Sequence, residues 1–263
     1  MPKAPAIRIT QGDVIYAYQN MKFTFLKPDG SIVKEVKSDV NSLLGIYLDN
    51  SNFLLEGMPM PSEKDKKTMV RISSLYDSSF NKIKDLDQIK QPSPLAQRIE
   101  GTYHNSVFEV NAGKIFTGNQ TRGYEIYVFN LDGNLIRKIR KDYKKVAPSE
   151  GYKEKYTKSF LNPQIYEFIK DRLYFPSSLP PFHSFITDNK GRIYVMTYEK
   201  GDNAGEYIFD IFNPEGVFIS RKSLEDFSTF ASLRGLIKND RFYYIKEKKS
   251  GFEKLMVYKM IWE

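Results

Sequence analysis

The chain repeats one pattern of strands and turns, and this repeat constrains its fold more than any other feature. The clearest copy occupies Phe185–Val195 and Tyr207–Ile219. An earlier copy occupies Val107–Phe116 and Ile126–Ile136. Each copy alternates short apolar runs with turns that contain Gly. Repetition at about 40 to 50 residues is typical of an array of β units, most often a propeller.

Five such units can be traced, over residues 7–36, 42–83, 107–136, 185–219 and 232–261. Three of them have an acidic residue followed by glycine between two alternating runs, at Asp29–Gly30, Asp132–Gly133 and Glu215–Gly216. Glycine tolerates the positive φ of a tight hairpin, and Asp can bond the turn backbone. The sequence therefore predicts an all-β propeller with five visible blades. We expect residues 1–263 to form a single domain.

One segment, residues 144–181, interrupts the repeat between the third and fourth units. Tyr152, Tyr156 and Phe160 have the spacing of one helix face, and a second helical run is expected over Gln164–Leu173. A Pro-rich stretch, Phe175–Phe182, then returns to the repeat. Two interpretations stay open: a helical excursion packed on the propeller, or a lid or docking element over one face.

The chain resembles the bacterial and archaeal six-bladed β-propellers related to NHL-repeat and TolB-like proteins. The resemblance rests on Tyr124–Ile139, Phe175–Phe185 and Asp210–Ile219. It implies six blades, so with five visible units we expect a six-bladed ancestry and an incomplete N-terminal part. It also implies a secreted or cell-envelope location. The sequence itself leaves the location unknown, because Met1–Pro5 is not followed by the apolar core of a signal peptide. The resemblance says little about activity, because such propellers serve as enzymes, receptors and scaffolds.

The two histidines, His104 and His183, each lie just before the first strand of a unit. Aligning the units on their turn glycines matches Ser106 with Ser184, and Asn105 with His183. First strands line the central channel of a propeller, so these side chains are expected at one mouth of the channel. The candidate ligand-binding residues are His104, Asn105, Ser106, His183, Ser184 and Arg234. The competing interpretation, which we favour, is that such polar side chains only bond neighbouring loops and water.

A metal site at the same place would use His104, Asn105 and His183. Six-bladed lactonases hold a central Ca²⁺, which takes six to eight oxygen ligands. The starts of the units here are short of carboxylates, which argues against a lactonase-like site. We find no phosphate loop, zinc-protease or nucleophile-elbow motif. The sequence therefore predicts no catalytic residue, no bound metal and no cofactor.

The formal net charge is +8, and much of the surplus is local. The stretch between Asn134 and Lys158 contains nine lysines and arginines and three acidic residues. The predicted basic patch comprises Arg137, Lys138, Arg140, Lys141, Lys144 and Lys145. It could attract an anionic partner. We favour a solvated basic face, because no nucleic-acid motif accompanies it.

These observations favour a non-catalytic ligand- or protein-binding propeller, with an unknown protein or glycan partner and no specific nucleic acid. A metal-dependent, lactonase-like hydrolase at the channel mouth is the first alternative. A structural subunit of a cell-surface assembly is the second, and an open propeller edge could then join chains. The sequence contains no run of 18 apolar residues, so it predicts no transmembrane segment.

Overall fold

The computed structural model describes residues 6–10, 12–59, 66–93, 95–102, 106–159, 163–203, 205–224, 235–247 and 253–261. Within these residues no helix is long and apolar enough to cross a membrane.

Within the described residues, five antiparallel sheets follow one another along the chain, and in each of them the strands lie in sequence order. Blade 1 comprises β1 (Ala6–Ile9), β2 (Ile15–Gln19), β3 (Lys22–Leu26) and β4 (Ile32–Lys37). Blade 2 comprises β5 (Ser42–Tyr47), β6 (Phe53–Gly57), β7 (Thr68–Tyr76) and β8 (Lys82–Pro92). Blade 3 comprises β10 (Ser106–Asn111), β11 (Lys114–Asn119), β12 (Glu125–Asn130) and β13 (Leu135–Arg140). Blade 4 comprises β15 (Ser184–Thr187), β16 (Ile193–Lys200), β17 (Tyr207–Phe212) and β18 (Phe218–Leu224). Blade 5 comprises β19 (Gly235–Lys238), β20 (Arg241–Glu247) and β21 (Glu253–Lys259).

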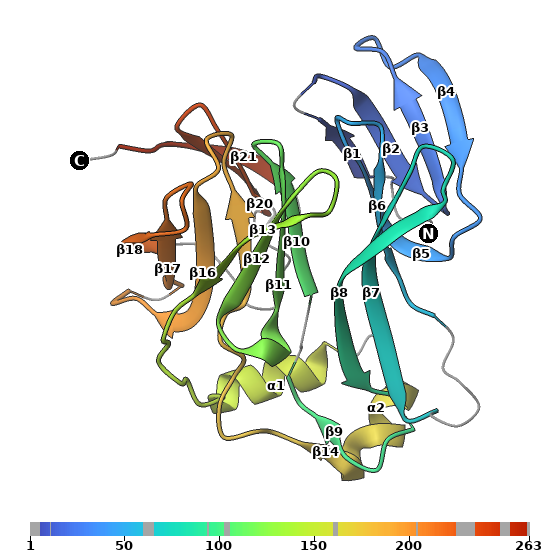
Figure 1. The fold of residues 1–263 in the computed structure, drawn as a ribbon. Helices are drawn as coiled ribbons and strands as arrows, with labels where there is room; N and C mark the ends of the chain where they lie inside the picture. Colours follow the sequence, from blue (N-terminus) through green and yellow to red (C-terminus); the bar gives the residue numbers. More distant parts are fainter. Residues whose placement is uncertain are drawn as a thin grey trace.

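The five sheets are arranged as the blades of a propeller, and two short helices lie at one end of it (Figure 1). The chain is therefore an all-β, five-bladed propeller, as the repeat predicted. The six-bladed ancestry with an incomplete N-terminal part stays a prediction.

The turns between the third and fourth strands have the expected chemistry. The glycines of the three predicted turns, Gly30, Gly133 and Gly216, all adopt positive φ. In the blade 3 turn, the side chain of Asn130 accepts hydrogen bonds from the backbone N–H groups of Asp132 and Asn134. Each turn thus bends the chain back with little steric cost.

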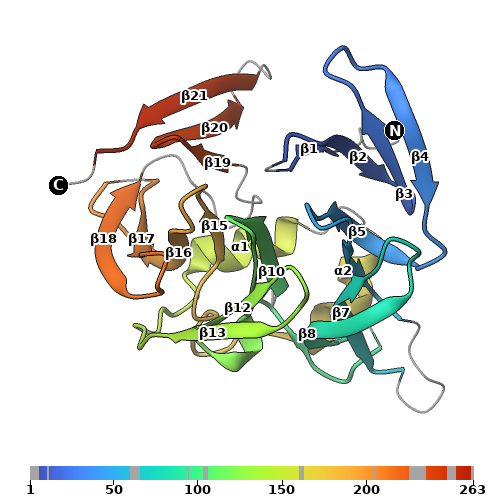
Figure 2. The same ribbon diagram turned by 45° about the horizontal axis from the view of Figure 1, so that its top comes forward.

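The core consists of apolar layers between successive blades. Tyr16, Phe116 and Tyr194 occupy the second strand of blades 1, 3 and 4, and each is almost fully buried. The layers pack β2 against β5, β8 against β11, β10 against β15, and β15 against β19. Among the described residues, no strand of blade 5 packs extensively against blade 1 (Figure 2). Each blade thus covers the next, except between the last blade and the first.

Candidate functional site

Between blades 3 and 4 the chain leaves the propeller and forms two helices, α1 (Glu150–Lys158) and α2 (Pro163–Ile169). A 3₁₀ turn (Lys170–Arg172) and a short strand, β14 (Leu173–Tyr174), follow, and β14 pairs in parallel with β9 (Ile99–Glu100). Ser149 precedes helix α1, and its Oγ accepts a hydrogen bond from the backbone N–H of Tyr152 at 3.2 Å. This is a standard N-cap.

The buried face of α1 attaches this segment to blade 4. Tyr152 and Tyr156, predicted on one helix face, are both buried and form a cluster with Leu179 and Tyr198. The Tyr152 ring meets the Tyr198 ring of β16 edge-on, with centroids 6.3 Å apart. Phe160, predicted on the same face, lies outside the described residues. The aromatic spacing of the sequence therefore marked a packing surface.

A cavity of about 570 Å³ lies between the start of α1 and blade 4, and we call it the insertion pocket. This volume is in the usual range for small-molecule sites. Three tyrosines contribute to its wall: Tyr152, Tyr198 and Tyr207. Four lysines also line it: Lys144, Lys145, Lys155 and Lys200.

The charge of the insertion pocket is strongly positive. The four lysines are exposed and form no ion pair with any described carboxylate. The described acid at the pocket, Glu199, is already paired with Arg221. Burial raises the pKa of Tyr198, and the nearby Tyr152 and Tyr207 raise it further, so its ring is neutral at ordinary pH. The pocket thus combines neutral aromatic walls with unpaired cations.

His183 and Ser184, two of the predicted site residues, lie next to this pocket. His183 Nδ1 is 2.9 Å from Ser184 Oγ, and its ring meets the ring of Tyr198 edge-on at 5.7 Å. Gln120 Nε2 donates to the carbonyl oxygen of His183 at 2.7 Å and fixes the backbone there. His183 therefore touches a wall residue of the insertion pocket without lining it.

Ser106 has a structural contact: its hydroxyl donates to Glu56 Oε1 of blade 2 at 2.5 Å. His104, Asn105 and Arg234 lie outside the described residues, so the predicted cluster at the channel mouth stays a prediction. Within the described ranges no group of three or more His, Cys, Asp or Glu side chains could hold a metal ion.

The predicted basic patch divides into two parts. In the first part the cations have partners. Arg137 donates a hydrogen bond to the carbonyl oxygen of Pro214 at 2.9 Å, and Arg140 forms an ion pair with Glu125. The Nζ atom of Lys141 lies 3.2 Å from Oδ2 of Asp210. Lys138 lies over the ring of Tyr127 at 4.8 Å. Lys144 and Lys145 instead line the insertion pocket.

Sequence reasoning missed Lys155, Lys200 and Tyr207 as pocket residues. A signal existed for Lys155, which follows the buried Tyr152 by three positions and so lies near it along the helix. No local pattern marks Lys200, because only the packing of the insertion on blade 4 brings it there.

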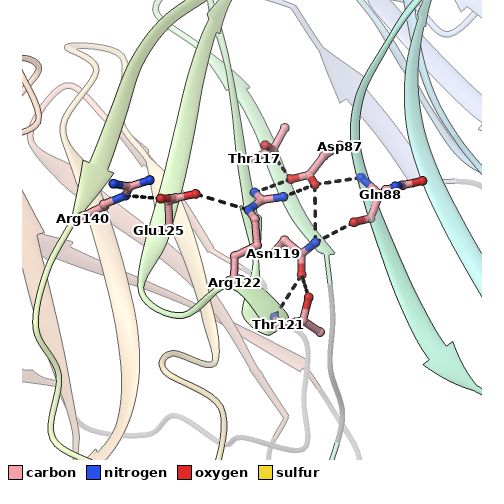
Figure 3. A network of polar contacts seen from close by, with 8 residues as sticks. All are labelled: Asp87, Gln88, Thr117, Asn119, Thr121, Arg122, Glu125 and Arg140. Atoms are coloured by element: carbon pink, nitrogen blue, oxygen red, sulfur yellow. Dashed lines mark hydrogen bonds and ion pairs between the residues drawn. The ribbon is translucent and has the colours of Figure 1, made fainter.

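A second polar cluster joins blades 2 and 3 around Asp87 (Figure 3). The Asp87 side chain is 2% exposed. Both terminal nitrogens of Arg122 donate to its two carboxylate oxygens, and the Nη2–Oδ2 distance is 2.8 Å. Thr117 Oγ1 also donates to Asp87, at 2.9 Å. Bidentate pairs of this kind are strong and directional.

A shallower cavity of about 360 Å³ lies beside this cluster. Its cations already have partners: Arg122 contacts Asp87 and Glu125, and Arg140 also pairs with Glu125. Lys141, its third cation, lies at the buried Asp210. A ligand would have to compete with these contacts, so we regard the insertion pocket as the better candidate site.

No protein-family model matches the chain, and no curated protein matches it. Solved structures do resemble it. The chain aligns with a gluconolactonase from Xanthomonas campestris at 9% identity and a TM-score of 0.43, over 90% of this chain and 67% of that one. It aligns with an acylaminoacyl peptidase from Pyrococcus horikoshii at 13% identity and a TM-score of 0.47, over 96% of this chain and 37% of that one.

A third similar structure is the β-propeller domain of the trilobed protease from Pyrococcus furiosus, which has an open velcro topology. The identity is 10% and the TM-score 0.40, over 98% of this chain and 69% of that one. At such identities and TM-scores, function has to be argued from the site itself.

Proposed function

We propose that this protein is a non-catalytic binding module that holds a small anionic glycan in the insertion pocket. The observation that carries the proposal is a cavity lined by three tyrosines and by four lysines that form no ion pair with a described carboxylate. Ammonium groups donate charge-assisted hydrogen bonds to carboxylate, sulfate or phosphate oxygens. Tyrosine provides a flat apolar ring with a polar tip, which suits the alternating apolar and hydroxyl surfaces of a sugar.

The proposal can be tested by titration calorimetry with a sulfated, uronic-acid disaccharide derived from heparin. A neutral disaccharide, maltose, serves as the control ligand. We expect the sulfated sugar to bind, and its affinity to fall as salt rises to about 0.15 M, because screening weakens contacts to exposed cations. Maltose should bind much more weakly.

Paired variants locate the site. Replacing Lys144 and Lys155 together by Gln should weaken binding at least about tenfold, which corresponds to about 1.4 kcal/mol. Lys158→Gln is the matched control, because Lys158 is on the same helix, pairs with Glu154 and does not line the pocket. Equal losses in both variants, or no binding of the sulfated sugar at low salt, would contradict the proposal.

The hydrolase hypothesis gives a different result. Elemental analysis of purified protein would then find stoichiometric Ca²⁺ or Zn²⁺, and the metal would disappear in His183→Ala. That outcome would replace the binding module by an enzyme with a site at the channel mouth.

We also propose that the chain is related to the NHL-repeat and TolB-like propellers. The repeated blades and their acidic–Gly turns support this placement. A secreted or cell-envelope location, and a protein partner in place of a glycan, belong to the same set of proposals. A protein segment that displaces the sulfated sugar from the insertion pocket would favour the protein partner.

A further inference from the structure

Blade 5 differs from the other blades in the environment of its third strand. In blades 1 to 4 the third strand pairs with a fourth, namely β4, β8, β13 or β18. The third strand of blade 5, β21, pairs only with β20 among the described residues. Its side chains Leu255 and Val257 are 60% and 51% exposed, whereas β12 and β17 are largely buried. Among the described strands, none pairs with the outer edge of β21.

The register shows which backbone groups of β21 point outward. Met260 N–H donates to the carbonyl oxygen of Asp240 at 2.8 Å, so this position is a hydrogen-bonded pair. Hydrogen-bonded and non-hydrogen-bonded pairs alternate in an antiparallel ladder. Tyr258 and Met256 consequently bond to β20. Val257 and its alternate neighbours, Leu255 and Lys259, direct their N–H and C=O groups to the outer edge.

The same alternate residues belong to an uncovered apolar face. Directly paired residues share a face, and the register pairs Leu236 with Tyr243, Tyr243 with Val257, and Ile245 with Leu255. This face points away from blade 4, because Ile237 and Phe242 on the other face are buried in the layer between blades 4 and 5. Leu236 and Ile245 are 54% and 44% exposed. We call this surface the blade 5 face.

One end of the blade 5 face is cationic. Lys238 pairs with Arg241, and Arg241 pairs with Lys259, so the three side chains form a row across the sheet. All three are exposed, and none forms an ion pair with a described carboxylate. A second copy of a chain with net charge +8 would bring further positive charge to this row. A segment with carboxylates at one end complements it.

We propose that an extended segment of a partner protein adds to blade 5 as its fourth strand, antiparallel to β21. The segment has alternate apolar residues that extend the blade 5 face beyond β21, and it carries acidic residues at its N-terminal end, beside Lys259. Backbone hydrogen bonds to β21 would supply affinity, and the side chains on alternate positions would supply specificity. This proposal is independent of the glycan site, which lies at the start of α1.

The probe is a synthetic peptide of seven alternating valines and threonines preceded by two glutamates, with a fluorophore for anisotropy. A peptide with lysines in place of the glutamates is the control ligand. We expect the acidic peptide to bind at least about tenfold more tightly than the basic one, because the row of cations attracts one and repels the other. Equal binding of the two peptides would overturn the assigned chemistry.

Val257→Pro tests the edge itself. Proline removes the outward N–H of residue 257 but keeps every donor of the β20–β21 ladder. The variant should therefore bind the peptide at least about tenfold more weakly. Val257→Thr is the matched control, because it keeps both the N–H and the β-branched shape, and it should change binding only slightly. If both variants bind the peptide like the wild type, the segment does not add to β21.

Hydrogen exchange on the unmodified protein provides a readout that needs no variant. Adding the acidic peptide should slow exchange of the Leu255, Val257 and Lys259 amides, and leave those of Met256 and Tyr258 nearly unchanged. Protection elsewhere without these three amides would overturn the proposal. The proposal would also be overturned if the protein self-associated with rising concentration and Val257→Pro abolished that association. A second copy of the chain, and not a partner protein, would then occupy the edge of β21.

Discussion

Glu109 lies on β10, the innermost strand of blade 3, and burial raises the pKa of its carboxyl to about 7. The guanidinium of Arg8 on β1 opposes this shift but does not cancel it. The ordinary value is 4.5, so the difference is about 2.5 pKa units. At about 1.36 kcal/mol per unit, the ionised carboxylate costs the folded state at most about 3–4 kcal/mol. Because the side chain is only half-buried, solvent screening reduces this to about 1–2 kcal/mol.

The sign of the pH dependence follows from proton binding. Between about pH 4.5 and 7 the folded state keeps the proton on Glu109 while the unfolded chain releases it. Stability therefore falls as pH rises through this window, and the loss is complete above the folded pKa. Glu109→Gln removes the titration and keeps the shape of the neutral acid. We expect the variant to match the wild type near pH 4 and to exceed it by about 1–2 kcal/mol at pH 8.

Urea unfolding at several pH values measures this difference, and thermal unfolding should show an increase in Tm of about 2–8 °C at pH 8. The matched control is Glu215→Gln, the same chemical change at an exposed turn position. At each pH, the free energy of unfolding of the wild type is subtracted from that of the variant. This difference no longer contains the contributions of the other carboxyl groups. If Glu109→Gln and the wild type have parallel stability profiles from pH 4 to 8, the reasoning about burial of Glu109 is wrong.

Three further predictions concern the contacts between and within blades. Asp87→Ala should destabilise the protein by about 3–5 kcal/mol in urea unfolding, because it leaves the partly buried Arg122 without its bidentate partner; an effect below about 1 kcal/mol would contradict the role of this pair. Gly45→Ala should cost about 1–3 kcal/mol, because the new Cβ would lie 2.6 Å from the ring of Phe23, and unchanged stability would show that the rings shift freely. The hydrogen bonds from Lys190 and Arg192 lower the pKa of Asp240 to about 2, so its stabilising contribution should be present above about pH 4 and disappear as pH falls towards 2. NMR titration of this carboxyl checks the shift, and a midpoint at its ordinary value of 3.8 would refute it.

The propeller could be predicted from local information because its blades are local structures. Each blade is a run of consecutive antiparallel strands, so alternating apolar residues and Gly-containing turns specify it within one stretch of chain. Tyr16, Phe116 and Tyr194, each on the second strand of its blade, are almost fully buried between blades. Tyr243, on the second strand of blade 5, is only partly buried. It lies on the blade 5 face, where no described blade follows.

The candidate site was only partly predictable. The sequence marked Lys144, Lys145 and His183 as residues of interest, and the structure places the two lysines in the insertion pocket and His183 beside it. Lys200 comes from the end of β16, and nothing near it in sequence signals a site. Arg140 belongs to the predicted basic patch, and the structure pairs it with Glu125.

The sequence by itself determined the class of fold, the number of visible blades and the surplus of positive charge. Those properties depend on composition and on patterns a few residues long. Only the tertiary structure decided which charges are neutralised by partners, where a cavity forms, and which described strand has a neighbour on one side only. These depend on distances between segments far apart in the chain, and the packing of one blade or helix on another sets such distances.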